Sequence, residues 1–164
     1  MTKAVRNQAR LLEEGDFAPD FTLDTDEGTK ITLSKLRGQN VVLYFYPKDD
    51  TPGCTLEAKD FTTLHRDFER FETVIIGLSK DDVESHKKFK EKYCMPFTLA
   101  SDMEGTVLEA YNVWVEKSMY GKSYMGIQRD TYLIDKKGVI QKIWRKVKVE
   151  GHAQEVFDAV TEIA

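Results

Sequence analysis

The sequence has few cysteines, no long apolar run and no excess of positive charge. Two cysteines among 164 residues are too few for a disulfide framework. No apolar run approaches the ~20 residues that a membrane-spanning helix needs, and the N-terminal segment lacks the apolar region of a signal peptide. We therefore expect a cytosolic protein with no membrane partner. A net charge of −4 and a pI near 5.5 give no electrostatic reason to expect a nucleic-acid partner.

The histidines give no sign of a metal site. His65, His86 and His152 show no metal-ligand spacing with either cysteine, so we expect no metal and no other cofactor, and assign no role to His65 or His86. With 41% hydrophobic and 32% charged residues, the chain fits one globular domain over residues 1–164. Residues 1–14 are expected to be an appended segment, helical over residues 2–14.

An alternation of strands and helices predicts an α/β fold. Residues 41–46 and 73–78 read as buried strands, and a segment with helical periodicity follows each of them, which implies parallel pairing. Residues 123–134 and 139–147 read as two strands joined by a hairpin turn at 135–138. The remaining expected elements are short strands at 21–23, 30–33 and 97–100, a helical turn at 33–36, and helices at 52–70, from 81, at 104–111 and at 152–163. Together they predict one mixed sheet flanked by helices.

The most informative cysteine, Cys54, lies at the start of a predicted helix. Pro47 ends the preceding strand, Pro52 suits the first helical position, and Thr51 suits the N-cap. Cys54 then falls in the first turn, where free N–H groups and the helix dipole stabilise an anion and so favour the nucleophilic thiolate. The alternative is a buried cysteine that acts as a small apolar residue.

Helical periodicity predicts which side chains face the core. Cys54 shares an apolar stripe with Ala58 and Phe61, so its side chain is expected to face inward. Cys94 ends the helix that begins near residue 81 and falls on the inner stripe of that helix. We therefore expect a structural role for Cys94 as a buried apolar residue.

The spaced residues Pro47, Thr51 and Cys54, with Gly53 before the cysteine, resemble the active-site segment of the peroxiredoxins. The runs at 46–49 and 51–55 are most similar to those of the bacterioferritin comigratory protein or PrxQ subgroup. This resemblance covers most of the chain from residue 12 onward. It implies a thioredoxin-like fold and a thiol-dependent peroxidase that reduces hydrogen peroxide and alkyl hydroperoxides.

The resemblance also implies roles for individual residues. Cys54 would attack the peroxide and become a sulfenic acid, the Thr51 hydroxyl would hydrogen-bond the peroxide, and Pro47 would shield the pocket from water. The segment at 126–129 is similar to the one that carries the active-site arginine, so Arg129 would stabilise both the thiolate and the transition state. Glu57, one helical turn after Cys54, would pair with Arg129. Without the resemblance, we would expect Arg129 to be a solvated charge on the surface of a strand. Glu57 would be a first-turn carboxylate that the helix dipole favours.

Two further features bear on the pocket and on the reductant. Residues 114–122 resemble a loop near the active site, in which Trp114 and Tyr120 line the pocket or simply pack. Related proteins often carry a second cysteine five residues after the first, and Lys59 occupies that position here. Cys94 is the only other thiol in the sequence, so it is the one possible resolving cysteine. We therefore favour a one-cysteine cycle completed by thioredoxin, glutaredoxin or a small thiol, in a monomer or weak dimer.

Two other functions remain open at this point. The same fold and cysteine could serve a redox sensor or a thiol-dependent chaperone, in which the oxidised cysteine signals rather than turns over. A disulfide reductase is a weaker alternative, because the sequence contains no Cys-x-x-Cys pair.

Overall fold

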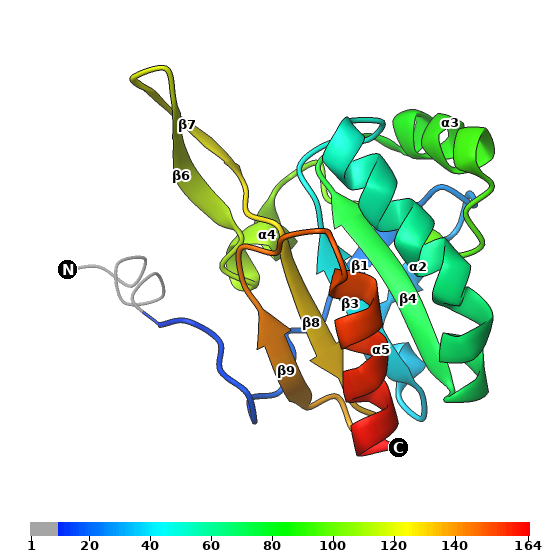
Figure 1. The fold of residues 1–164 in the computed structure, drawn as a ribbon. Helices are drawn as coiled ribbons and strands as arrows, with labels where there is room; N and C mark the ends of the chain where they lie inside the picture. The colour runs from blue at the N-terminus through cyan, green and yellow to red at the C-terminus, as the bar shows by residue number, and fades with distance from the viewer. Residues whose placement is uncertain (1–9) are drawn as a thin grey trace.

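The computed structural model describes residues 10–164, which form a mixed sheet covered by helices and a separate two-stranded hairpin (Figure 1). The main sheet has the strand order β2-β1-β5-β4-β3-β8-β9. β3, β4 and β5 are mutually parallel, whereas β8 runs antiparallel to β3. The elements are β1 (Thr22–Thr25), β2 (Lys30–Thr32), the 3-10 turn η1 (Leu33–Leu36), β3 (Asn40–Phe45), α2 (Pro52–Arg70), β4 (Thr73–Ser79), α3 (Val83–Tyr93), β5 (Thr98–Ser101), α4 (Thr106–Ala110), β6 (Trp114–Met119), β7 (Lys122–Ile127), β8 (Asp130–Ile134), β9 (Ile140–Trp144) and α5 (His152–Ile163).

The central strand β3 is buried along its whole length because helices and loops cover both of its faces. Its side chains alternate between the two halves of the core. Val41 and Leu43 join the half that includes residues of η1 and α4. Val42 and Tyr44 join the half formed by α2, α3 and α5. The expected α/β sandwich around one mixed sheet is confirmed, and α2 is positioned so that its first turn lies beyond the end of β3.

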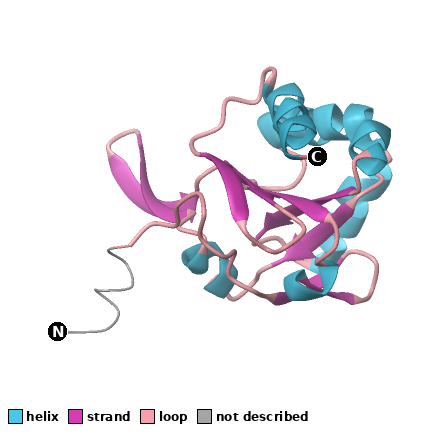
Figure 2. Cartoon of the chain, turned by 90° about the horizontal axis from the view of Figure 1, so that it is seen from below, coloured by secondary structure: helices cyan, strands magenta, loops and turns pink. Residues whose placement is uncertain are grey.

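The predicted strand over residues 123–134 is wrong in its extent. Residues 122–127 instead pair with β6 and form the antiparallel β6–β7 hairpin, which stands apart from the main sheet (Figure 2). The break falls at Gln128, whose backbone N–H donates to the carbonyl of Val113 at 2.7 Å. Only the part from Asp130 onward pairs with β3. Its hairpin with β9 forms as predicted, but β9 ends at Trp144 rather than at residue 147.

The predicted N-terminal helix lies mostly outside the described residues, because the description begins at residue 10. Residues 10–13 are not helical. Tertiary hydrogen bonds occupy the backbone there: the Leu12 N–H donates to Oδ1 of Asn112 at 2.8 Å, and Arg145 donates to the Leu12 carbonyl at 3.1 Å. Over residues 10–164, every helix is too short or too polar to cross a membrane.

Candidate active site

The loop after β3 delivers the chain into α2 as the sequence predicts. α2 begins at Pro52, with Thr51 as the extended N-cap residue. The Thr51 side chain does not cap the helix, however, because its hydroxyl donates to the carbonyl of Lys48 at 2.9 Å. The first-turn N–H groups of α2 are thus left without a side-chain acceptor from the N-cap.

Cys54 lies in this first turn with only 2% of its surface exposed. Arg129, immediately before β8, donates from Nη2 to the Cys54 sulfur at 3.4 Å. The same guanidinium donates from Nη1 to Oε1 of Glu57 at 2.7 Å. The structure therefore brings together the cysteine, the arginine and the carboxylate that the sequence singled out, with the arginine bridging the other two.

The charges of this group are strongly perturbed. Burial raises the pKa of Glu57 to about 7, although the Arg129 guanidinium opposes the rise. Burial disfavours the charge on Arg129, but the negative charges of Glu57 and Cys54 outweigh it and raise the pKa of Arg129. Burial and the Arg129 charge lower the pKa of Lys117 on β6, against an opposing effect of Cys54. Arg129 therefore stays charged beside the sulfur.

Gly53 allows the close approach of the arginine. A Cβ atom added at Gly53 would lie 3.2 Å from Nη2 of Arg129. This separation is tighter than ordinary packing, so the absence of a side chain at Gly53 leaves the guanidinium room beside Cys54.

Two buried polar atoms near the sulfur have no hydrogen-bond partner among residues 10–164: the Tyr44 hydroxyl and Oε2 of Glu57. Burial, followed by the charges of Glu57 and Cys54, raises the pKa of Tyr44 well above its usual range. The Tyr44 hydroxyl therefore stays protonated and can donate. An unpaired buried polar group is costly, so these two atoms are a local exception to the otherwise satisfied polar groups of the core.

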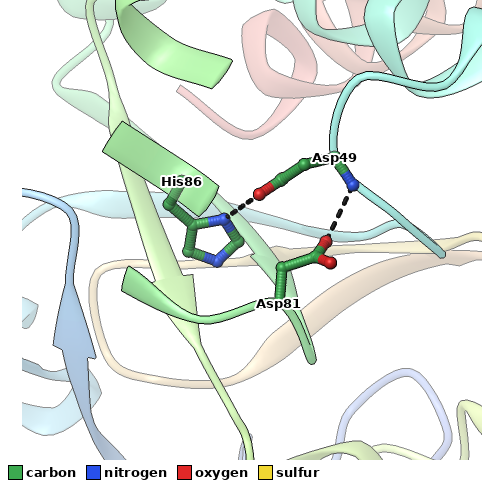
Figure 3. Close-up of side chains that lie close together, drawn as sticks. All are labelled: Asp49, Asp81 and His86. Carbon is green, nitrogen blue, oxygen red and sulfur yellow. Dashed lines mark hydrogen bonds and ion pairs between the residues drawn. The ribbon is translucent and has the colours of Figure 1, made fainter. Parts of the chain in front are cut away.

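A second polar cluster, which the sequence did not reveal, lies beside the loop before α2 (Figure 3). It consists of Asp49, Asp81 and His86, whose ligand atoms lie within 4.8 Å of one another. His86 belongs to the inner stripe of α3, and this buried histidine in a helix of a small α/β domain is the one signal that could have pointed to the cluster. Most of the facing atoms are used in hydrogen bonds among the protein's own groups, so the cluster carries no argument for a metal.

The structure bears on four further residues that the sequence analysis named around Cys54. Cys94 is exposed rather than buried, because this C-cap residue of α3 adopts a left-handed backbone with φ 53° that turns it away from the helical stripe. Tyr120 is 96% exposed at the tip of the β6–β7 hairpin and lines no pocket. Trp114 is half-buried against the core, with Lys80 over its ring, which favours the packing alternative. Pro47 is half-buried in the loop before α2.

A thioredoxin-like sheet with a buried cysteine in the first helical turn, held beside an arginine, defines a class of thiol-based redox proteins. Residues 15–143 match the AhpC/TSA family. The chain belongs to this family, and its relatives are peroxiredoxins of the Bcp or PrxQ type. The peroxiredoxin Bcp of Bacillus subtilis is 49% identical to this chain, and the matched region covers 93% of this chain and 98% of the Bacillus subtilis protein.

Solved structures agree with this assignment. A cysteine-to-serine mutant of Xylella fastidiosa PrxQ superposes with a TM-score of 0.89 at 37% identity, covering 94% of this chain and 98% of its own. The bacterioferritin comigratory protein of Xanthomonas campestris, a protein with alkyl peroxide reduction activity, superposes with a TM-score of 0.83 at 42% identity, covering 87% and 90%.

Proposed function

We propose that this peroxiredoxin reduces hydrogen peroxide and alkyl hydroperoxides through Cys54. The observation that carries the proposal is the Cys54 sulfur in the first turn of α2, 3.4 Å from a guanidinium nitrogen of Arg129. A cation and free N–H groups stabilise the thiolate over the thiol, and the thiolate is the form that attacks a peroxide. The alkyl peroxide reduction activity of the Xanthomonas campestris relative supports the substrate class.

In the proposed reaction, the Cys54 thiolate attacks one peroxide oxygen and the O–O bond breaks. The leaving oxygen takes a proton and departs as water or an alcohol, and Cys54 becomes a sulfenic acid. Arg129 faces the charge that develops on the breaking bond, as the geometry of an electrostatic stabiliser requires. The Thr51 hydroxyl donates to Lys48, so its oxygen remains free to accept a hydrogen bond from a peroxide O–H. Pro47, half-buried in the loop before α2, is the proposed shield of the sulfur from water.

A thiol must restore Cys54. An external thiol attacks the sulfenic sulfur, water leaves, and a second thiol releases the resulting mixed disulfide. Thioredoxin, glutaredoxin and small thiols are the proposed reductants. The exposed position of Cys94 removes the packing cost that argued against its use as a resolving cysteine. What still favours the one-cysteine cycle is the folded first turn of α2, which encloses Cys54 and would have to unwind for a disulfide.

Peroxide consumption tests the proposal. We expect the wild type, with dithiothreitol as reductant, to consume hydrogen peroxide and cumene hydroperoxide, and Cys54→Ser to consume neither above the background rate. If the protein were instead a redox sensor or chaperone, each chain would be oxidised once at Cys54 and would not turn over. Turnover that persists in Cys54→Ser, or that is missing from the wild type, would refute the enzyme assignment.

A further inference from the structure

His86 is completely buried, and both of its ring nitrogens face hydrogen-bond acceptors. Nε2 lies 3.0 Å from the backbone carbonyl of Ala100, which can only accept, so Nε2 carries a proton. Nδ1 lies 2.8 Å from Oδ2 of Asp49. If Asp49 is a carboxylate, Nδ1 must donate as well, and His86 is an imidazolium.

The other partners of Asp49 indicate that it is a carboxylate. The Tyr46 hydroxyl donates to its Oδ1 at 2.6 Å, and the Ser85 hydroxyl donates to its Oδ2 at 2.7 Å. Burial raises the pKa of Tyr46 well above its usual range, so the phenol keeps its proton and acts as the donor. With three donors around it, Asp49 accepts from every side, and a buried ion pair with His86 satisfies both groups.

Asp49 and its neighbour fasten the loop before α2 to both ends of α3. At the start of α3, the Asp49 N–H donates to Oδ2 of Asp81 at 2.7 Å, in addition to the contact with His86 (Figure 3). At the end of α3, the Asp50 carboxylate accepts from Lys92 at 2.8 Å and from the Tyr93 hydroxyl at 2.9 Å. These side-chain bonds link residues far apart in the sequence.

The loop needs such fastening because regular structure does not determine its path. Asp50 has a left-handed backbone with φ 58°, which is uncommon for a residue with a side chain. Thr51, the N-cap of α2, follows directly, and Cys54 lies in the next turn. A shift of the loop would therefore move the first turn of α2 relative to Arg129, which comes from the separate segment just before β8.

We propose that Asp49 and His86, joined as a buried ion pair, act through their hydrogen bonds to position the first turn of α2, and so hold Cys54 beside Arg129. This inference rests on the proposed function, in which Cys54 is the reactive thiol. Neither residue touches the sulfur or the peroxide in this scheme. They act through the loop, and misplacement of a reacting group by about 1 Å can cost on the order of 100-fold in rate.

The central test compares Asp49→Ala with Asp49→Asn, both in a Cys94→Ser background so that Cys54 is the only thiol. Alanine removes every side-chain bond at this position. Asparagine keeps the shape: its oxygen can accept from Tyr46, and its amide can donate to Nδ1 of a neutral His86. We expect Asp49→Ala to slow the reaction of Cys54 with hydrogen peroxide about 10- to 100-fold, and Asp49→Asn to stay within about threefold of the parent.

A matched control separates positioning from general damage to the fold. Asp26 is also a buried aspartate bonded to α3, through Lys90 at 2.6 Å, and to the Leu99 N–H at 2.9 Å, but it does not touch the loop. Asp26→Ala should reduce stability without the loss of rate. If Asp49→Ala and Asp26→Ala react with peroxide at similar rates, Asp49 does not position Cys54.

Two readouts are independent of peroxidase turnover. Alkylation of Cys54 by iodoacetamide as a function of pH should shift to higher pH in Asp49→Ala and remain near the parent profile in Asp49→Asn. This comparison holds even if the protein proves not to be a peroxidase. Nitrogen-15 NMR of the parent protein at pH 7 should show both ring nitrogens of His86 protonated, and Asp49→Asn should show one. A singly protonated His86 in the parent protein would overturn the ion pair without any mutation.

Discussion

The sulfur of Cys54 and the guanidinium of Arg129 lie 3.4 Å apart although 75 residues separate them in the sequence. Cys54 comes from the first turn of α2, and Arg129 from the segment between β7 and β8. Antiparallel pairing of β3 with β8 places Phe45 opposite Asp130, and so brings the start of β8 to the end of β3 where the loop to α2 begins. The contact is a product of strand register.

Replacement of Arg129 by methionine should slow the reaction with peroxide by about 100- to 1,000-fold, the usual loss when one transition-state donor is removed. It should also reduce the thiolate fraction of Cys54 at pH 7, since the nearby positive charge favours the anion. Stopped-flow peroxide kinetics and a pH profile of alkylation measure the two effects. Arg66→Met, at an exposed position of α2, controls for the lost charge. An unchanged alkylation profile in Arg129→Met would assign the stabilisation of the thiolate to another group.

Gly53→Ala should separate activity from stability. An added methyl group would lie 3.2 Å from Nη2 of Arg129 and push the guanidinium away from Cys54. We expect peroxide reduction to fall about tenfold, in line with the sensitivity of rate to small displacements. The free energy of unfolding should stay equal or rise by up to about 1 kcal/mol, because alanine is the better helix former. Urea unfolding and peroxide kinetics on the same sample test this, and full activity would show that Arg129 can accommodate the methyl group.

Glu57 should make stability depend on pH in a defined direction. Burial raises the pKa of Glu57 from its ordinary value of 4.5 to about 7, so the folded protein holds this proton more tightly than the unfolded chain. The resulting stabilisation is fully present below pH 4.5 and is lost as the pH rises through 7. Relative to Glu57→Gln, the free energy of unfolding of the wild type should fall by about 1–3 kcal/mol across this range.

Chemical denaturation at several pH values gives this difference directly. Glu91→Gln, at an exposed carboxylate on α3, serves as the control and should parallel the wild type. A wild type whose stability relative to Glu57→Gln is flat or rises with pH would contradict the raised pKa.

The two possible catalytic cycles give protein products of different mass after treatment with one equivalent of peroxide. In the favoured one-cysteine cycle, the intact chain gains one oxygen, and a sulfenic-acid reagent traps the product at Cys54. If a disulfide forms between Cys54 and Cys94, the chain instead loses two hydrogens, and this loss would vanish in Cys94→Ser. The second outcome would refute the one-cysteine cycle and would require the first turn of α2 to unwind.

Local sequence patterns were enough to predict the features that depend on neighbouring residues. The apolar run of β3, the proline that follows it and the Thr51-Pro52 start of α2 are local signals, and they placed Cys54 in the first helical turn correctly. Helical periodicity also predicted the burial of Cys54, because Cys54 shares one face of α2 with the buried residues Ala58 and Phe61. The family resemblance indicated Arg129 and Glu57, whose contact with each other the structure shows.

Features that depend on how distant segments meet could not be predicted from such local patterns. The periodicity of α3 predicted a buried Cys94, but the helix ends at Tyr93 and the left-handed backbone of Cys94 breaks the period. Alternation alone could not show that the strand predicted over residues 123–134 divides, because the Gln128 N–H bonds to Val113 of another segment. The pairing of Asp49 with His86 spans 37 residues. No local pattern encodes it, since side-chain bonds of this kind form only once β3, β5 and α3 have packed together.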